Sequence, residues 1–157
     1  MTVSGLRFVI TGAAAGIGAG TARLAAERGA RVVLSDVDDE SGERVAREIR
    51  DAGGEAIYRH CDVTDEDQVS SLMVAAAEAF GGIDVLHNNA GIHESLISDR
   101  LSLDQMSLAT FQRVMAVNVS GVWLCARHAL PHLCDSDNAS IINAGSVSSI
   151  TGYPQCQ

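Results

Sequence analysis

Short apolar runs alternate with amphipathic stretches along the chain. The apolar runs predict five β-strands, at residues 6–12, 30–36, 55–63, 83–91 and 139–146. The helical patterns lie between them, at about 16–28, 38–54, 64–80 and 108–133. Strands that alternate with helices in this way predict an α/β fold, a Rossmann-type doubly wound parallel sheet with right-handed crossovers. The last strand, which contains Ile141–Ile142, is expected to be buried.

Two of the helices carry more detailed signals. Thr64 and Asp67 resemble a capping box at the start of the third helix. The side chains expected on the core face of this helix are Val69, Leu72, Met73, Ala76 and Phe80.

An asparagine interrupts the apolar face that we expect for the long helix. Phe111, Met115, Val122 and Cys125 form a stripe at helical spacing, and Asn118 lies on it. A buried amide there needs hydrogen-bond partners. From the residues alone, Asn118 is either a structural group that braces a neighbouring strand or a functional one.

The carboxyl ends of the predicted strands indicate where a ligand binds. In doubly wound sheets, ligands bind in the crevice beyond these ends. The residues that follow the predicted strands are Gly12–Gly18, Asp36, Asp62–Val63, Asn88–Gly91 and Ser146.

The segment TGAAAGIG (11–18) joins the first strand to the first helix. Gly12 permits a sharp turn, Gly16 permits a close approach to a pyrophosphate, and Gly18 permits close packing of the helix on the strand. The helix N-terminus favours an anion. No lysine follows the last glycine, which excludes the phosphate loop of ATPases. The alternative is a glycine-rich turn without a ligand.

An acidic residue ends the second strand. A carboxylate at Asp36 accepts hydrogen bonds from the adenosine ribose and repels a 2′-phosphate, and its neighbours Ala15 and Val37 carry no positive charge. We therefore expect NAD rather than NADP as the cofactor. The alternative is a solvated aspartate, since Asp38 and Asp39 follow.

Composition narrows the range of functions. A chain of 157 residues is the size of one domain, and its formal charge of −9 argues against nucleic acid or an anionic membrane as the main partner. No apolar run is long enough to span a membrane. Four widely spaced cysteines and no secretory signal predict free thiols and a cytoplasmic protein. His87 and His93 lack a second ligand at useful spacing, so we expect no metal.

Together the motifs resemble those of the classical short-chain dehydrogenase/reductase family. They are TGAAAGIG, Cys61-Asp62-Val63, Asn88-Asn89-Ala90-Gly91, VNVSG (117–121) and IINAGS (141–146). The resemblance spans residues 1–157 and implies a single NAD-binding domain and reversible hydride transfer between nicotinamide and an alcohol or carbonyl. The small-molecule substrate itself is not readable, and His93, Glu94 and Asp99 hint only at a polar mouth.

The resemblance also implies roles for individual residues. The cofactor-binding set is Gly12, Ala15, Gly16, Ile17, Gly18, Asp36, Val37, Asp62, Val63, Asn89, Ala90 and Gly91. In this set Asp62 and Val63 hold the adenine edge, and Asn89, Ala90 and Gly91 line the adenosine ribose. A further interpretation of Asn88–Asn89 is turn chemistry, because Asn tolerates a left-handed backbone.

The same resemblance assigns two catalytic residues. Ser146 binds the substrate oxygen, with Ser148 and Ser149 as alternatives in register, and Asn118 anchors a water in a proton relay. The family's Tyr-x-x-x-Lys pair is missing. Tyr153 does not fit it, because the position four residues later is Gln157 and the chain contains no lysine.

We therefore expect residues 1–157 to be the front of a longer protein, an NAD-dependent dehydrogenase that without the catalytic helix is inactive. The alternatives are a non-catalytic NAD-binding module and an inert fragment. The resemblance implies a homodimer or homotetramer for the full-length form.

Overall fold

The computed structural model describes residues 2–93 and 104–146, and within them the chain forms one parallel sheet. The strands are β1 (Arg7–Thr11), β2 (Arg31–Asp36), β3 (Glu55–His60), β4 (Val85–Asn88) and β5 (Ser140–Asn143). Their spatial order is β3-β2-β1-β4-β5, and every pair is parallel. The predicted doubly wound parallel sheet is therefore confirmed.

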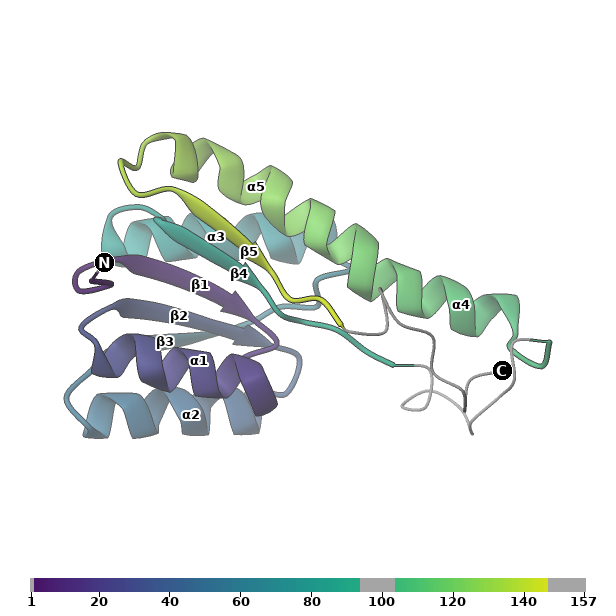
Figure 1. Cartoon of the computed structure of the whole chain (residues 1–157), viewed down its shortest axis with the longest axis horizontal. Coiled ribbons are helices and arrows are strands. Elements are labelled where there is room, and N and C mark those ends of the chain that lie inside the picture. Colours follow the sequence, from purple (N-terminus) through teal and green to yellow (C-terminus); the bar gives the residue numbers. More distant parts are fainter. Residues whose placement is uncertain (1, 94–103, 147–157) are drawn as a thin grey trace.

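Helices cover both faces of this sheet (Figure 1). On one face α1 (Gly16–Glu27) and α2 (Asp39–Asp51) pack on alternate strand residues such as Ile10 and Leu34. On the other face α3 (Glu66–Phe80) and α5 (Val122–Cys134) pack on the intervening residues, such as Val9. Because side chains alternate across a strand, the short apolar runs supply both layers of the core.

The strands β3, β4 and β5 end three residues earlier than predicted, and after β3 and β4 side chains bind the backbone N–H groups that follow. The N–H of Asp62, beyond β3, donates to Gln68 Oε1 at 2.9 Å. The N–H of Asn89, beyond β4, donates to Thr11 Oγ1 at 3.1 Å. The chain thus leaves the ladder at the edge where the site is expected.

The cap of α3 also differs from the prediction. Asp65, not Thr64, is the N-cap residue, and its carboxylate accepts hydrogen bonds from the N–H groups of Asp67 and Gln68. The Thr64 hydroxyl donates to Asp62 instead, so it is not free to cap the helix. The predicted core face is otherwise correct: Val69, Leu72, Met73 and Ala76 are buried, and Phe80 is partly buried.

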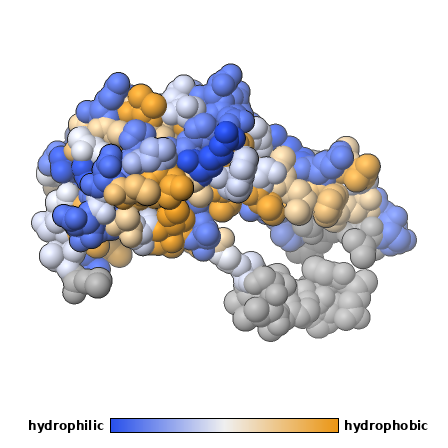
Figure 2. Space-filling view, turned by 90° about the horizontal axis from the view of Figure 1, so that it is seen from above, coloured by the Kyte–Doolittle hydropathy of each residue, from blue (hydrophilic) through white to orange (hydrophobic). Residues whose placement is uncertain are grey.

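The predicted long helix is one rod with three parts. An α-helix, α4 (Leu108–Met115), leads into a π-helical segment, η2 (Ala116–Gly121), which leads into α5. The predicted stripe is wrong at its start, because Phe111 is 51% and Met115 39% exposed. The reason is that α4 extends past the end of the sheet (Figure 1), and Figure 2 shows apolar surface along this arm.

The last strand is exposed, which contradicts the expectation of a buried strand. Ile141 is 41% and Ile142 47% exposed. Within the described residues, β5 pairs only with β4 and forms an edge of the sheet. None of the helices in the described residues is long and apolar enough to cross a membrane.

Candidate functional site

A cavity of about 360 Å³ opens at the carboxyl edge of the sheet. It lies where the strand order reverses, between the loops after β1 and β4, and extends to the loops after β2 and β3. The residues that line it are Gly12, Ala15, Gly16, Asp36, Val37, Cys61, Asp62, Val63, Asn89, Ala90, Gly91, Ile92, Arg113 and Val117. This is the position at which open α/β sheets bind ligands.

The structure brings together the predicted cofactor residues, with two exceptions. Ile17 is 74% exposed in the first turn of α1 and does not line the cavity. Gly18 is buried beneath the loop, where an added Cβ would lie 2.6 Å from Asn89 Nδ2 and closer still to the carbonyl oxygen of Gly12. Gly18 therefore shapes the wall without reaching the cavity.

The glycine loop leaves an electropositive helix end facing open space. Gly12 has a φ of 64°, and an added Cβ there would lie 2.7 Å from Ala90 Cα. Gly16 has a φ of 54°, and the space around its missing Cβ is open. No side chain of the described residues caps α1, and its first turn carries no acidic residue. An anion fits such an uncapped helix end.

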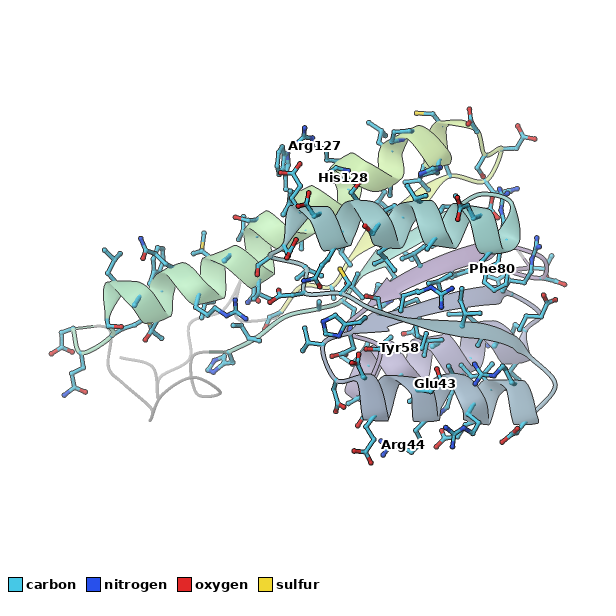
Figure 3. The ribbon with its side chains drawn as sticks, turned by 180° about the vertical axis from the view of Figure 1, so that it is seen from behind. Glu43, Arg44, Tyr58, Phe80, Arg127 and His128 are labelled. Atoms are coloured by element: carbon cyan, nitrogen blue, oxygen red, sulfur yellow. The ribbon has the colours of Figure 1, made fainter. Side chains whose placement is uncertain are left out.

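Asp36 joins the loop after β1 to the end of β2. Its Oδ2 accepts a hydrogen bond from the N–H of Ala14 at 2.9 Å, and its Oδ1 accepts one from the N–H of Val37 at 2.8 Å. The Tyr58 hydroxyl donates to the Asp36 carbonyl at 2.7 Å, and Figure 3 shows Tyr58 reaching from β3 towards α2. Asp36 thus presents a fixed carboxylate to the cavity.

Thr11 and Asn89 hold the two loops of the switch point together. Thr11 Oγ1 accepts hydrogen bonds from the N–H groups of Asn89 and Ala90, both at 3.1 Å. Asn89 Nδ2 donates back to the carbonyls of Thr11 and Gly12. No non-glycine residue of the described chain has a positive φ. The interpretation of Asn88–Asn89 as residues for a left-handed backbone is therefore wrong. Asn89 instead holds the two loops together through the hydrogen bonds of its side-chain amide.

Asp62 stands at the far wall of the cavity. Its Oδ1 accepts hydrogen bonds from the N–H and the hydroxyl of Thr64, at 2.9 and 2.7 Å. Burial alone would raise the pKa of Asp62, but the bonds from Thr64 and the charge of Arg113 lower it below its ordinary value. The carboxylate is thus kept ionised, as an acceptor-only group.

Asn118 braces the segment that follows β4. Its Oδ1 accepts a hydrogen bond from the N–H of Ile92 and its Nδ2 donates to the Ile92 carbonyl, both at 2.8 Å. Asn118 is exposed rather than buried as predicted. Both ends of the amide are nevertheless paired with Ile92, four residues beyond the end of β4, and the functional role of Asn118 stays a prediction.

The remaining residues named from the sequence do not line the cavity or lie outside the described residues. Ser146 is exposed and lies three residues beyond the end of β5. Tyr153, Ser148, Ser149, Glu94 and Asp99 lie outside the described residues. His87 is buried, which lowers its pKa, and among the described residues no group of three or more potential ligands could hold a metal ion.

Four residues of the cavity wall were not predicted: Cys61, Ile92, Arg113 and Val117. Cys61 and Ile92 adjoin predicted residues, so a wider window around each strand end would have included them. Arg113 and Val117 are four residues apart on the rod and share a helix face. The buried residues Val117, Gly121 and Leu124, at spacings of three to four, were the sequence signal for this face.

The chain is similar to known proteins over most of its length. A family model described as short chain dehydrogenase matches residues 7–157. Cis-4-hydroxycyclohexanecarboxylate dehydrogenase of Sinomonas cyclohexanicum is 47% identical over 144 residues, which are 92% of this chain and 56% of that protein. A 2,5-dichloro-2,5-cyclohexadiene-1,4-diol dehydrogenase of Sphingobium indicum is 35% identical over 97% of this chain and 58% of its own length.

Solved structures show the same likeness. A short-chain type dehydrogenase/reductase from Mycobacterium marinum superposes with a TM-score of 0.89 at 36% identity, over 98% of this chain and 60% of that one. The chain therefore spans somewhat more than half the length of these relatives.

Proposed function

The chain belongs to the short-chain dehydrogenase/reductase family, and on that premise we propose that it is the cofactor-binding part of an NAD-dependent oxidoreductase. The reaction proposed is hydride transfer between nicotinamide and a secondary alcohol or ketone. A bound nicotinamide supplies the hydride acceptor or donor. The observation that carries the proposal is the cavity at the switch point, with a fixed carboxylate at Asp36 and an uncapped helix end at Gly16.

The residues of the cavity fit a dinucleotide at three places. The open N-terminus of α1, with no Cβ at Gly16, suits a pyrophosphate. The Asp36 carboxylate suits ribose hydroxyls and disfavours a 2′-phosphate, which supports NAD over NADP. Asp62 and the N–H of Val63 offer an acceptor and a donor to the adenine edge. Ala15, Val37, Asn89, Ala90 and Gly91 supply the walls between them.

Two residues are proposed to serve the chemistry. The Ser146 hydroxyl would donate a hydrogen bond to the substrate oxygen and stabilise negative charge that develops on it. Asn118 would hold a water of the proton relay, in addition to the bonds with Ile92 that the structure shows. For the substrate we propose a cyclic secondary alcohol, supported by relatives named as dehydrogenases of a hydroxycyclohexanecarboxylate and a cyclohexadienediol.

A non-catalytic NAD-binding module is the second candidate function for residues 1–157. The observation that favours it is the complete absence of lysine from the sequence. A tyrosine with an ordinary pKa near 10 needs a neighbouring cation to act as a proton donor at neutral pH. Turnover of cyclic alcohols with NAD by these residues alone would exclude the module. NAD binding without turnover by a longer form that carries the catalytic pair would support it, since residues 1–157 alone are expected to be inactive in either case.

The cofactor assignment is tested by changing Asp36. We expect the wild type to bind NAD more tightly than NADP, and Asp36→Arg to weaken NAD binding about tenfold while improving NADP binding, because a charged contact is lost and a phosphate partner is gained. Calorimetric titration with both dinucleotides measures the two Kd values. Glu40→Gln is the control, since it removes a nearby exposed acid that does not line the cavity.

A gain in NADP binding cannot arise from a partly unfolded variant, so the loss of the Asp36–Ala14 bond does not confuse this test. If Asp36→Arg kept the wild-type preference, the role of Asp36 would be wrong. If a longer form with the catalytic pair bound NAD but oxidised none of a panel of cyclic secondary alcohols, the hydride-transfer proposal would be wrong.

A further inference from the structure

Arg113 lies on the cavity wall without any role in the function proposed above. It projects from α4, on the arm that extends beyond the sheet, and meets residues that follow β3. Among the described residues that line the cavity, only Arg113 carries a positive charge. Its placement opposite Asp62 joins the rod to the far end of the cavity.

The two oxygens of Asp62 have different surroundings. Oδ1 accepts two hydrogen bonds from Thr64, and the N–H of Asp62 is bonded to Gln68. Oδ2 lies 3.6 Å from Arg113 Nη2. One oxygen is therefore fixed by the neighbouring chain, while the other is free to accept a hydrogen bond from a ligand in the cavity.

Arg113 and Asp62 attract each other at a distance longer than that of a hydrogen bond. Arg113 Nη1 lies 3.5 Å from the Thr64 hydroxyl, and the side chains of Arg113 and Asp62 are 51% and 31% exposed. These separations exceed those of charge-assisted hydrogen bonds, which are about 2.7–2.9 Å. The guanidinium thus attracts the free oxygen and leaves it able to take a further donor.

We propose that Arg113 is a positioning residue for the adenine end of the dinucleotide: it holds the free oxygen of Asp62 towards the base. The proposal rests on the proposed function, in which Asp62 accepts a hydrogen bond from the adenine amino group. Arg113 acts through Asp62, so its contribution to binding requires the carboxylate.

The test is a double-mutant cycle on the binding of NAD and of ADP-ribose, which keeps the adenosine and lacks nicotinamide. Arg113→Gln is expected to raise both Kd values about fivefold to tenfold, the loss expected when a charged contact is weakened. Arg113→Lys, which keeps the charge, is expected to restore most of the affinity. In the Asp62→Asn background, Arg113→Gln is expected to change the Kd little, because coupled residues are non-additive.

Arg127→Gln is the matched control. Arg127 is an arginine of the same rod, pairs with Glu66 at 2.8 Å, and lies with His128 at the first turn of α3 (Figure 3). Its removal is expected to leave both Kd values unchanged.

The outcomes separate this proposal from the function on which it rests. Wild-type protein that bound neither NAD nor ADP-ribose would overturn both. Wild-type binding with no effect of Arg113→Gln would overturn the role of Arg113 alone. An effect of Arg113→Gln that persisted in Asp62→Asn would also overturn it, since Arg113 would then act independently of Asp62.

Discussion

Gly18 shows how one residue connects the cavity to the stability of the fold. An added Cβ at Gly18 would collide with the backbone of Gly12 and the amide of Asn89, two residues that line the cavity. We expect Gly18→Ala to lower the free energy of unfolding by roughly 1–3 kcal/mol through overpacking and to weaken NAD binding. Urea denaturation and calorimetric titration measure the two effects.

The control is Gly20→Ala, two residues further along α1, where an added Cβ meets nothing within 4 Å. Alanine there is expected to stabilise the helix by about 0.5–1 kcal/mol. A Gly18→Ala variant as stable as Gly20→Ala would contradict the close packing.

Single residues also show which parts of the cavity could be predicted from the sequence. Asp36 and Asp62 were predictable as cavity residues because parallel strands bring their carboxyl ends to one edge, whatever the lengths of the connections. Arg113 was not, because it reaches the cavity from a helix whose crossing over the sheet edge is fixed by tertiary packing. Thr64 was misjudged because two adjacent residues offered a capping oxygen and a local pattern did not distinguish them.

Among the elements, η2 is the one that periodicity could not reveal. A pattern of 3.6 residues per turn predicts an uninterrupted helix, whereas η2 has the wider turn of a π-helix. Gly121 packs against Val63 so closely that an added Cβ would lie 2.7 Å from Val63 Cγ2, and Asn118 faces Ile92. The segment therefore joins the rod to two other walls of the cavity.

The brace made by η2 can be tested at Asn118. Asn118→Ala removes both hydrogen bonds with Ile92, which is expected to cost about 1–2 kcal/mol of stability because both bonds are exposed. We also expect faster amide exchange at Ile92 and weaker NAD binding, since Ile92 lines the cavity. Ser120→Ala, an exposed change in the same segment, is the control. Unchanged exchange at Ile92 would show that Asn118 does not hold this segment.

At the scale of the whole molecule, an ion pair opposite the cavity joins the two halves of the sheet. Arg7 of β1 donates to Asp84 from Nε at 2.8 Å and from Nη2 at 2.6 Å, and the Ser136 hydroxyl donates to the same carboxylate. The side chain of Asp84 is only 7% exposed. No short pattern marks this pair in the sequence, because its members become neighbours only when β4 pairs with β1.

The pair predicts a pH-dependent stability. The Arg7 guanidinium holds the pKa of Asp84 well below its usual range. The stabilisation is therefore complete above the unfolded pKa of about 3.9 and is lost as the pH falls towards the folded pKa. We expect Asp84→Asn to lower the free energy of unfolding by roughly 3 kcal/mol at neutral pH, and by progressively less in acid. Urea denaturation of both proteins at several pH values measures the difference.

Asp51→Asn is the control for this titration, because Asp51 is an exposed acid at the end of α2. Its effect is expected to stay within about 0.5 kcal/mol. If the difference in free energy of unfolding between wild type and Asp84→Asn did not narrow in acid, the carboxylate charge would not be the source of this stability.

The strands and their parallel pairing were predictable from the sequence, but the exposure of the last strand was not. Apolar runs bounded by glycine and polar residues marked all five strands, and their spacing implied parallel pairing. The exposure of Ile141 and Ile142 was not predictable, because an apolar pair gives no information on what covers it. Burial of an edge strand depends on neighbours elsewhere in the chain.

The central place of β1 has a consequence for how the chain folds. β1 pairs with β2, a near neighbour in sequence, and with β4, where Phe8 meets Val85 across two intervening strands and three helices. Closing so long a loop costs more entropy than closing a short one, so local pairings form more readily. The cavity lies between the loops after β1 and β4 and exists only once this distant pairing is made. A nucleotide that binds there as proposed would therefore recognise only chains that have completed this distant pairing, and its binding would report on finished folding.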